Sequence, residues 1–322
     1  MYSAAAKARR ETTGTRWVLA LVSVTLLVAG CGSDAPGRNA RKGGAARDLA
    51  TITVASFSFS ESQTLGEIYA QVLERNGYRV QRALGLASRE VVEPALEQGV
   101  VDLVPEYLGT ALAFVAPKSR DTRLDQAGTY ARLRSVLGAR GIDVLTPAPA
   151  QNQNGLMVTR TTAQRDRLAK VSDLVPMAGS LVLGGPPECP ERPFCLPGFR
   201  STYGLRFKEF RPLDSGGPRT IAALESAVID VGVLFTTDAA LGGPGPSVVL
   251  LEDDRGLQPP ENVVPMVRRA VVRRHGRAFV ALVDRVSAQL ETVDLIALNR
   301  QVDIDGVTPA NAAAGWRRAH GF

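Results

Sequence analysis

The central and C-terminal parts of the chain alternate short β-rich runs with segments of helical periodicity. Residues 51–57 have the composition of a strand, and apolar side chains recur at helical spacing over 65–73 before Gly77. Ser60 and Gln63 have the spacing of a capping box, with Ser60 as the predicted N-cap. Further strands are predicted over 78–84, 100–104 and 142–145, and further helices over 91–98 and 132–139. This alternation predicts an α/β architecture.

A polar break over residues 147–155 separates this first group of elements from a second group. After the break, strands are predicted over 156–159, 180–183, 207–210 and 229–235, and helices over 164–174 and 220–227. The last part of the chain is strand-like near 263–267 and helical from about residue 279. The break therefore divides the predicted elements into two similar groups.

Residues 95–107 align without gaps with residues 223–235. Each copy has the pattern of a helix end, a turn and a buried strand, and places Tyr107 or Phe235 at the far end of that strand. In open α/β sheets, the carboxyl ends of the strands face the ligand crevice. The two copies favour two similar lobes facing each other across a cleft. The alternative, a turn that is simply common in α/β proteins, stays open at this point.

Residues 1–30 have the layout of an export signal. Four basic residues precede an apolar run over 17–29, which is too short to span a bilayer comfortably. The run ends in Val28-Ala29-Gly30-Cys31, which resembles a bacterial lipobox. We expect residues 1–30 to be a lipoprotein signal peptide and Cys31 to carry two acyl chains, enough for lasting attachment to a membrane. The alternative is an uncleaved N-terminal anchor. The basic residues are Lys7, Arg9, Arg10 and Arg16.

Cleavage before Cys31 changes the charge of the chain. The leader carries four basic residues and Glu11, so the formal net charge falls from +6 to +3. Residues 31–49 are then the lipidated cysteine and a flexible tether, because the segment 32–47 is rich in Gly, Ala and Arg without large apolar side chains. The sequence has no basic stripe with interleaved aromatic residues, so nucleic-acid binding is not expected.

Cys189 and Cys195 are the two cysteines that remain once Cys31 is assigned to lipid. An exported protein meets an oxidising compartment, so a disulfide across this Pro-rich loop is predicted. A metal site is the competing interpretation, but the spacing does not fit a zinc knuckle. The chain has only two histidines, His275 and His320, and neither lies nearby in the sequence.

Eight short blocks follow one another from about Thr51 to the C-terminus. They are Leu65-Gly66-Glu67-Ile68-Tyr69-Ala70, Val104-Pro105-Glu106-Tyr107-Leu108-Gly109-Thr110, Pro147-Ala148-Pro149-Ala150, Leu196-Pro197-Gly198, Phe207-Lys208-Glu209-Phe210, Pro212-Leu213-Asp214-Ser215-Gly216, Phe235-Thr236-Thr237-Asp238 and Leu251-Glu252-Asp253-Asp254. In content and order they resemble the substrate-binding lipoproteins of ABC importers for glycine betaine, choline and proline betaine, the osmoprotectant-binding family.

The resemblance implies a type II periplasmic-binding-protein fold. Two α/β lobes are joined by two crossover segments, near residues 151–154 and 260–265, with a ligand cleft between the lobes. Lobe 1 is expected to comprise residues 50–152 and 264–322, and lobe 2 residues 153–263. Such lobes close around a small ligand by a hinge motion.

The resemblance also implies a cage of aromatic rings around a quaternary ammonium ion. Tyr107 matches a cage tyrosine, Thr110 a polar contact, and Phe235 a second aromatic position. Two positions depart from the family, since Asn154 replaces a tyrosine and Ser62 replaces a glutamine. The ligand-binding residues expected from the resemblance are Phe59, Glu61, Ser62, Tyr107, Thr110, Asn152, Asn154, Phe235, Thr236, Thr237 and Asp238.

These departures leave two hypotheses about the ligand. In the first, the pocket prefers a more polar or larger solute than glycine betaine, because Asn154 and Ser62 offer no ring to a trimethylammonium group. Each lost cation–π contact weakens binding by roughly 0.5 to 2 kcal/mol. In the second hypothesis, another ring, from Phe59 or Tyr203, refills the cage.

The function expected from the resemblance is capture of a small solute and its delivery to an ABC permease driven by an ATPase. The protein is then a monomer, exported and held by lipid on the outer face of the cytoplasmic membrane. The alternative is an anchored binding or sensing lipoprotein without a transport role, and neighbouring permease and ATPase genes would favour import.

Catalysis is not expected, and neither is a metal or a cofactor. The segment 213–218 resembles the nucleophile segment of trypsin-like serine proteases, in which the serine needs a histidine base within reach. Neither His275 nor His320 has the sequence surroundings of that base. We therefore interpret Ser215 as part of a turn that precedes a helix.

Overall fold

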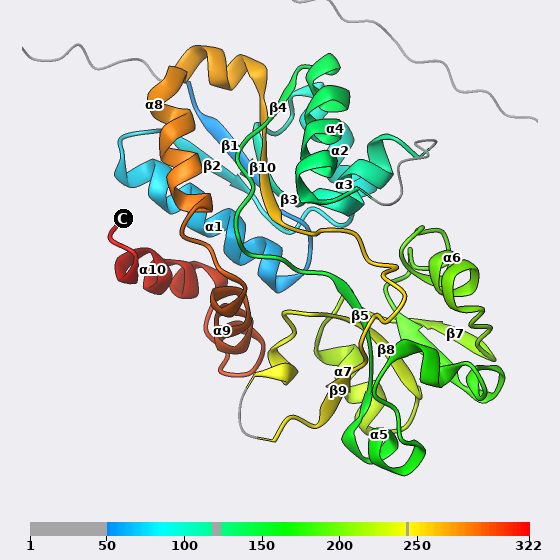
Figure 1. Ribbon diagram of the computed structural model, residues 1–322. Helices are drawn as coiled ribbons and strands as arrows, with labels where there is room; N and C mark the ends of the chain where they lie inside the picture. The colour runs from blue at the N-terminus through cyan, green and yellow to red at the C-terminus, as the bar shows by residue number, and fades with distance from the viewer. Residues whose placement is uncertain (1–49, 118–123, 243–244) are drawn as a thin grey trace, which may run out of the picture. The chain divides into compact units, whose positions relative to one another are not determined.

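The computed structural model describes residues 50–117, 124–242 and 245–322. Its strands form two five-stranded sheets, of order β2-β1-β3-β10-β4 and β7-β6-β8-β5-β9 (Figure 1). The first sheet contains β1 (Ile52–Ala55), β2 (Val80–Ala83), β3 (Leu103–Tyr107), β4 (Ile142–Val144) and β10 (Val263–Arg268). The second contains β5 (Asn154–Thr159), β6 (Val182–Gly185), β7 (Glu209–Pro212), β8 (Val231–Phe235) and β9 (Val248–Leu250). We call each sheet with its helices a lobe, the first and the second.

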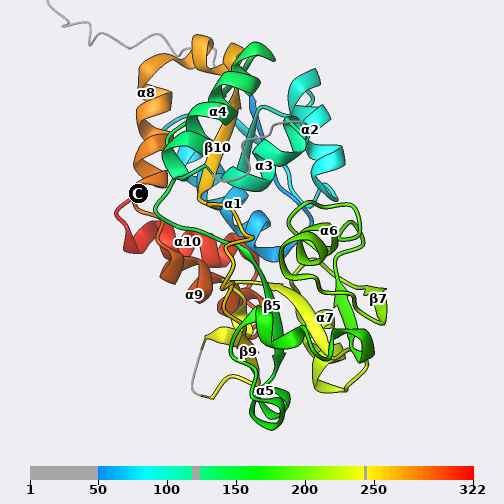
Figure 2. The ribbon, with the colours of Figure 1, turned by 45° about the vertical axis from the view of Figure 1, so that its right-hand side comes forward.

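Helices lie between the strands in both lobes, so the predicted α/β architecture is confirmed. The first lobe contains α1 (Ser60–Arg75), α2 (Arg89–Gln98), α3 (Leu108–Val115), α4 (Gln126–Ala139) and α8 (Arg269–Ser287). The second contains α5 (Arg160–Asp166), α6 (Leu196–Gly198) and α7 (Pro218–Glu225). Two C-terminal helices, α9 (Thr292–Asp303) and α10 (Pro309–Ala319), pack against α1 (Figure 2). None of the helices in the described ranges is long and apolar enough to cross a membrane.

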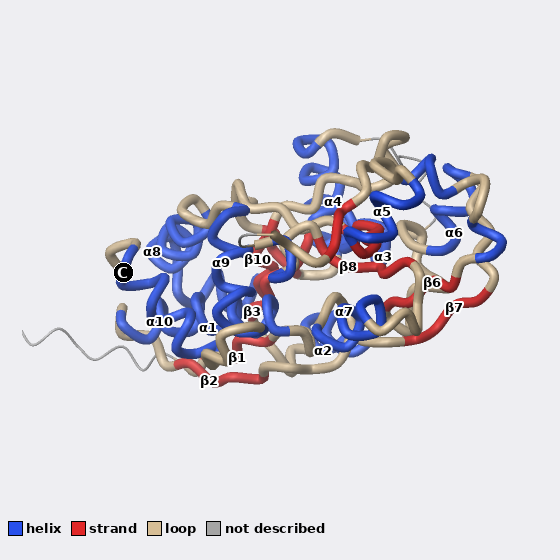
Figure 3. Tube along the Cα trace, turned by 90° about the horizontal axis from the view of Figure 1, so that it is seen from below, coloured by secondary structure: helices blue, strands red, loops and turns tan. Residues whose placement is uncertain are grey.

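The two sheets share one topology. In each, one strand, β1 or β6, pairs in parallel with two neighbours, and an antiparallel strand lies between one of those neighbours and the edge strand. The antiparallel strands are β10 in the first sheet and β5 in the second. The internal repeat falls on α2–β3 in the first lobe and on α7–β8 in the second, at corresponding positions. The repeat therefore reflects two similar lobes. Figure 3 shows the strands in two groups, with β1, β3 and β10 in one and β6, β7 and β8 in the other.

Two crossover segments connect the lobes, one from β4 to β5 and the other from β9 to β10. The crossovers are hydrogen-bonded to each other. Gln151 and Asn262 form an antiparallel bridge. Beside it, the backbone N–H of Asn152 donates to the carbonyl of Glu261 (3.0 Å), and that of Val263 donates to the carbonyl of Ala150 (3.0 Å). The two connections therefore run as a short ribbon rather than as independent linkers.

The largest apolar core lies in the first lobe. All five side chains of β3 are buried, which fits a central strand covered on both faces. In the second lobe the core forms two clusters, one of which contains Cys189 and Cys195 beside Phe199 and Tyr203. The Sγ atoms of the two cysteines lie at bonding distance, 1.95 Å apart.

The start of α1 differs from the prediction. The N-cap is Phe59 in an extended conformation, and no side chain caps the helix. The Ser60 hydroxyl donates to Asp303 Oδ2 (3.0 Å), and the Gln63 amide donates to the carbonyl of Ser58 (2.8 Å). The predicted capping box is therefore wrong, because the Ser60 side chain binds Asp303 on α9 and the Gln63 side chain binds a backbone carbonyl just before the helix.

Leu96 on α2 has no exposed surface and belongs to the core of the first lobe. We expect Leu96→Ala to lower the free energy of unfolding by about 2–5 kcal/mol, through lost apolar burial and the cavity that remains. The matched control is Val100→Ala at a side chain that is 67% exposed, with an expected change within about 0.5 kcal/mol. Urea denaturation measures both. Equal effects of the two variants would contradict this packing.

Candidate functional site

A cavity of about 990 Å³ opens between the carboxyl ends of strands from both sheets. The first lobe lines it with the segment after β1, the start of α2, the end of β3 and α3. The second lobe lines it with the loops 186–195 and 213–217 and with Phe235 at the end of β8. The crossovers add Asn152 and Glu261, β5 adds Asn154, and α9 adds Asp303. The site is therefore composite, as expected where strand ends of an α/β sheet meet.

Four of the aromatic residues that line this cavity lie close together, and we call Phe57, Phe59, Tyr107 and Phe235 the aromatic cluster. Phe59 is its centre, with ring centroids 5.9 Å from Phe57, 6.0 Å from Tyr107 and 5.4 Å from Phe235. Phe59 occupies this place because it is the extended residue just before α1. Residue 216 must be a glycine beside Phe235, since a Cβ at this position would lie 2.2 Å from the Phe235 ring. Both lobes therefore supply rings to one cluster.

The carboxylate of Glu61 is hydrogen-bonded to one member of the aromatic cluster, Tyr107, and is buried (3% exposed). Its Oε1 accepts hydrogen bonds from the Tyr107 hydroxyl (2.6 Å) and the Asn152 amide (2.7 Å). Its Oε2 accepts from the Thr237 hydroxyl (2.6 Å) and the Asn299 amide (2.7 Å). Burial and the adjacent carboxylate raise the pKa of Tyr107 well above its usual value, so the phenol keeps the proton that it donates. Glu61 therefore joins both lobes, one crossover and α9.

Two guanidinium groups line another side of the cavity, those of Arg89 and Arg192. Arg89 makes a bidentate pair with Glu106 through Nε (2.5 Å) and Nη2 (2.8 Å), and Nη2 also donates to the Thr110 hydroxyl (3.0 Å). Its guanidinium also lies over the ring of Phe57, 5.4 Å from the centroid. A buried guanidinium with such partners is held in a fixed orientation.

Glu261, on the second crossover, anchors the start of α3 at the cavity. Its carboxylate accepts from the backbone N–H groups of Gly109 (3.0 Å) and Thr110 (2.9 Å). Burial raises its pKa to about 8, against the lowering effect of Arg89 and these N–H groups. Gly109 is required here, since a Cβ at that position would lie 2.4 Å from Pro259.

The structure brings six of the eleven expected ligand-binding residues to the cavity wall: Phe59, Tyr107, Thr110, Asn152, Asn154 and Phe235. Asn154 pairs with Phe235 in the β5–β8 ladder, so the residue that replaces the family's tyrosine lies beside a ring. The Oδ1 atom of Asn152 is buried without a hydrogen-bond partner among the described residues. This atom is an acceptor available to a bound donor or water.

The other five expected residues lie behind the wall and bind protein groups. Ser62 accepts from the backbone N–H of Phe57 (2.9 Å), which orients the segment that carries Phe57 and Phe59. Thr236 accepts from the N–H of Gln153 (2.9 Å). Glu61 and Thr237 bind each other, and Asp238 accepts from the N–H of Ala240 (2.8 Å). Their contacts with a ligand stay predictions.

Sequence reasoning missed Phe57, Arg89, Arg192 and Asp303, all of which line the cavity. Phe57 and Phe59 alternate along an extended segment, and this spacing was a usable signal. No local pattern distinguishes Arg89 or Arg192 from surface arginines. Tyr203, one ring proposed to refill the cage, lies in the second-lobe core, where its hydroxyl binds Asp253.

No group of three or more His, Cys, Asp or Glu side chains within the described ranges has an arrangement that could hold a metal ion. Ser215 lines the cavity without a nearby histidine. His275 packs against Tyr78 and Phe279, and His320 stacks on Trp316. The described residues therefore present no serine–histidine pair at the cavity.

We expect Glu61→Gln to lower the free energy of unfolding by about 3 kcal/mol. The neutral side chain turns one carboxylate oxygen into an N–H₂ group that faces two hydrogen-bond donors. The control is Glu97→Gln, which removes a partly exposed ion pair with Arg140 and should cost less than about 1 kcal/mol. Thermal and urea unfolding measure the difference. A loss no larger than that of the control would contradict the role of Glu61.

Asp238 generates a pH-dependence prediction. Burial, and the nearby carboxylates of Asp303 and Asp214, raise its pKa from 3.8 to about 6. A raised carboxyl pKa favours the protonated folded state, so this contribution to stability is lost as the pH rises from about 4 to about 6. Asp238→Asn keeps the acceptor for Ala240 and removes the titration. We expect the free energy of unfolding of Asp238→Asn, relative to that of the wild type, to increase as the pH rises from about 4 to about 6. Urea denaturation at several pH values measures it. Parallel pH profiles of the two proteins would contradict the raised pKa of Asp238.

Comparison with known proteins places this architecture in a family. Residues 50–319 match the family model described as the substrate binding domain of the ABC-type glycine betaine transport system. A glycine-betaine-binding protein of Pseudomonas aeruginosa is 31% identical over 84% of this chain and 88% of its own length. The glycine betaine-binding protein YehZ of Escherichia coli is 26% identical over 84% of this chain and 91% of its own length.

Solved structures agree on the fold. A glycine betaine/carnitine/choline ABC transporter structure superposes with a TM-score of 0.68 at 22% identity, covering 84% of this chain and 98% of that one. Lactococcal OpuAC in its closed, glycine betaine-bound form gives a TM-score of 0.61 at 17% identity, covering 84% and 96%. The type II periplasmic-binding-protein fold is thereby confirmed, and the chain belongs to the family of substrate-binding domains of ABC-type glycine betaine transport systems.

Proposed function

We propose that this protein is the extracytoplasmic solute-binding component of an ABC importer and captures a quaternary ammonium osmoprotectant of the glycine betaine and choline class. The observation that carries the proposal is the aromatic cluster, with Phe59 in contact with Phe57, Tyr107 and Phe235. The π-faces of such rings attract a cation that has no N–H to donate, which is the recognition mode of quaternary ammonium groups.

Phe59 supports the hypothesis of a refilled cage. Its ring lies between Tyr107 and Phe235, so the cluster keeps several π-faces although Asn154 contributes none. Gly216 and the extended backbone at Phe59 fit this arrangement, since each leaves room for a neighbouring ring. We therefore favour a quaternary ammonium ligand over a purely polar one.

Ligand capture is proposed to proceed by closure of the two lobes over the cavity. The proposed lobes are residues 50–152 with 264–322, and residues 153–263, with the paired crossovers as the hinge. The backbone bonds between the crossovers support this hinge, because they let both connections bend as one ribbon. The closed protein would then deliver its solute to a permease driven by an ATPase.

The proposed location is the outer face of the cytoplasmic membrane. Lipid on Cys31 would hold the protein there, and residues 32–47 would act as the tether; both lie outside the described residues. The Sγ–Sγ distance of Cys189 and Cys195 supports a disulfide in the exported form. We propose a monomer without catalytic activity.

The test is titration calorimetry of the delipidated protein with glycine betaine and choline. We expect saturable binding of at least one, and Phe59→Leu to weaken it roughly 2- to 30-fold, the equivalent of one cation–π contact of about 0.5 to 2 kcal/mol. Phe207→Leu, at a ring outside the cavity wall, is the matched control and should bind like the wild type. No binding of either solute, or an unaffected Phe59→Leu variant, would overturn the proposal.

A further inference from the structure

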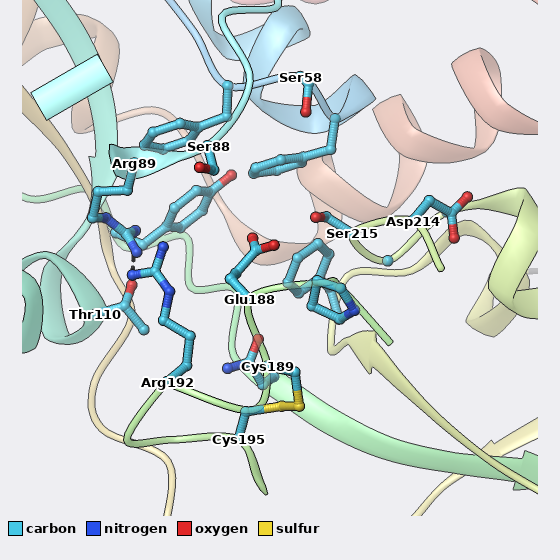
Figure 4. A pocket seen from close by; sticks show the side chains of 18 of the residues that line it. Ser58, Ser88, Arg89, Thr110, Glu188, Cys189, Arg192, Cys195, Asp214 and Ser215 are labelled. Atoms are coloured by element: carbon cyan, nitrogen blue, oxygen red, sulfur yellow. Dashed lines mark hydrogen bonds between the residues drawn. A yellow bond between two sulfur atoms is a disulfide. The ribbon is translucent and has the colours of Figure 1, made fainter. Parts of the chain in front are cut away.

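The first lobe has an end that lies opposite the ligand cavity. The cavity, whose lining side chains Figure 4 shows, lies at the carboxyl ends of the strands, whereas the described chain begins at Ala50, just before the amino end of β1. β10 runs antiparallel to β3, so its carboxyl end returns to this place. There the N–H of Arg268 donates to the carbonyl of Asp102 (3.0 Å), and the N–H of Asp102 donates to that of Thr53 (2.8 Å). The start of β1 and the start of α8 therefore lie together, at the end of the first lobe that points away from the second (Figure 1).

Five arginines gather at this end, and we call them the basic face: Arg140, Arg268, Arg269, Arg273 and Arg274. The first four line a groove of about 370 Å³ between the ends of α2 and α4 and the start of α8. Arg274 follows on α8, and the helix bends just after it, at Gly276. The first turns of α8 therefore lie across the end of the lobe (Figure 1).

Carboxylates offset only part of the positive charge of the basic face. The ion pairs are Arg140–Glu97 (2.8 Å), Arg268–Asp102 (3.1 Å) and Arg269–Asp143 (2.8 Å). Arg273 and Arg274 are exposed, and neither makes a hydrogen bond or an ion pair with a described residue. Arg269 binds Asp143 through Nε, so its two terminal nitrogens have no acceptor among the described residues. The basic face therefore keeps cationic charge and unused N–H donors, which are the groups that bind phosphate.

An exposed apolar side chain adjoins the basic face. Val100, in the turn between α2 and β3, is 67% exposed. The residue before it, Gly99, lies against the guanidinium of Arg268, since a Cβ at this position would lie 2.5 Å from the Cζ atom. Val100 is therefore a neighbour of the arginines. Cationic side chains beside an exposed apolar one are typical of a surface that binds at the headgroup boundary of a membrane.

We propose that the basic face lies against the headgroups of an anionic phospholipid membrane, with the groove facing the lipid phosphates. The position of the chain outside the described residues favours a membrane over an acidic protein as the partner. Cys31, the proposed site of the lipid anchor, precedes Ala50 by 19 residues, and a flexible chain of that length spans about 25 Å on average. The anchor would therefore keep this end of the first lobe close to the lipid.

The inference goes beyond solute binding and does not depend on which solute the cavity holds. It assigns the anchored protein an orientation for capture. With the basic face on the membrane, the carboxyl ends of the first-lobe strands, and with them the cavity, point away from the lipid. The cavity is then open to solutes in the surrounding solution.

The experiment measures co-sedimentation of the delipidated protein with vesicles at low salt. One set of vesicles contains phosphatidylglycerol and phosphatidylcholine, and the other phosphatidylcholine alone. We expect binding to the anionic vesicles only, and its loss at high salt, which screens the charges. The double variant Arg273→Gln, Arg274→Gln should bind roughly 25-fold more weakly, about fivefold for each arginine. The matched control, Arg200→Gln with Arg206→Gln, removes two exposed arginines of the second lobe and should change binding less than about twofold.

A pair of valine variants tests the position of the contact. Val100 and Val228 align in the internal repeat, and both are exposed (67% and 46%). Val100→Asp places a negative charge beside the basic face and should weaken vesicle binding about fivefold or more. Val228→Asp makes the same change in the second lobe and should leave binding within about twofold of the wild type.

Three outcomes would overturn the inference. A wild type that does not bind the anionic vesicles at low salt refutes it. Equal losses in the two double-arginine variants, or in the two valine variants, show attraction by net charge rather than by this face. Binding to native membranes but not to lipid-only vesicles assigns the face to a protein partner. Circular dichroism and thermal unfolding check that each variant is folded, and solute titration tests the proposed function separately.

Discussion

The buried carboxylate of Glu61 is the interaction on which the cavity depends. Its two oxygens accept four hydrogen bonds, from Tyr107 on β3, Asn152 on a crossover, Thr237 beyond β8 and Asn299 on α9. A buried carboxylate without partners is costly, so the folded state favours the arrangement that brings all four donors together. That arrangement also sets the Tyr107 ring at the cavity and holds the first crossover against both lobes.

The aromatic cluster and the two arginines give the cavity distinct chemical sides. Phe59, at its centre, contacts rings from both lobes, whereas Arg89 and Arg192 bring one guanidinium from each lobe. Closure of the lobes would therefore complete both sides at once. The Cys189–Cys195 bond in the loop 186–195 and the hydrogen bonds between the crossovers restrict the backbone around the cavity. Less conformational entropy is therefore lost when a ligand is bound.

Much of the fold was predictable, since alternating strand and helix patterns and the internal repeat at Tyr107 and Phe235 depend on local sequence. The start of α8 was placed about ten residues too late, because paired arginines at 268–269 and 273–274 hide a helix with one buried face. The site was only partly predictable. Tyr107, Thr110 and Phe235 follow strand ends, whereas Arg89 and Arg192 meet across the cleft and share no sequence pattern. The ion pair between Glu90 and Arg192, 102 positions apart in the sequence, arises from lobe packing alone.

The proposed function depends on the aromatic cluster holding a quaternary ammonium ion. The most direct measurement is a crystal structure of the delipidated protein with glycine betaine. We expect the trimethylammonium nitrogen within about 6 Å of the ring centroids of Phe59, Tyr107 and Phe235. A ligand bound elsewhere in the cavity, with these rings in contact only with one another, would contradict it.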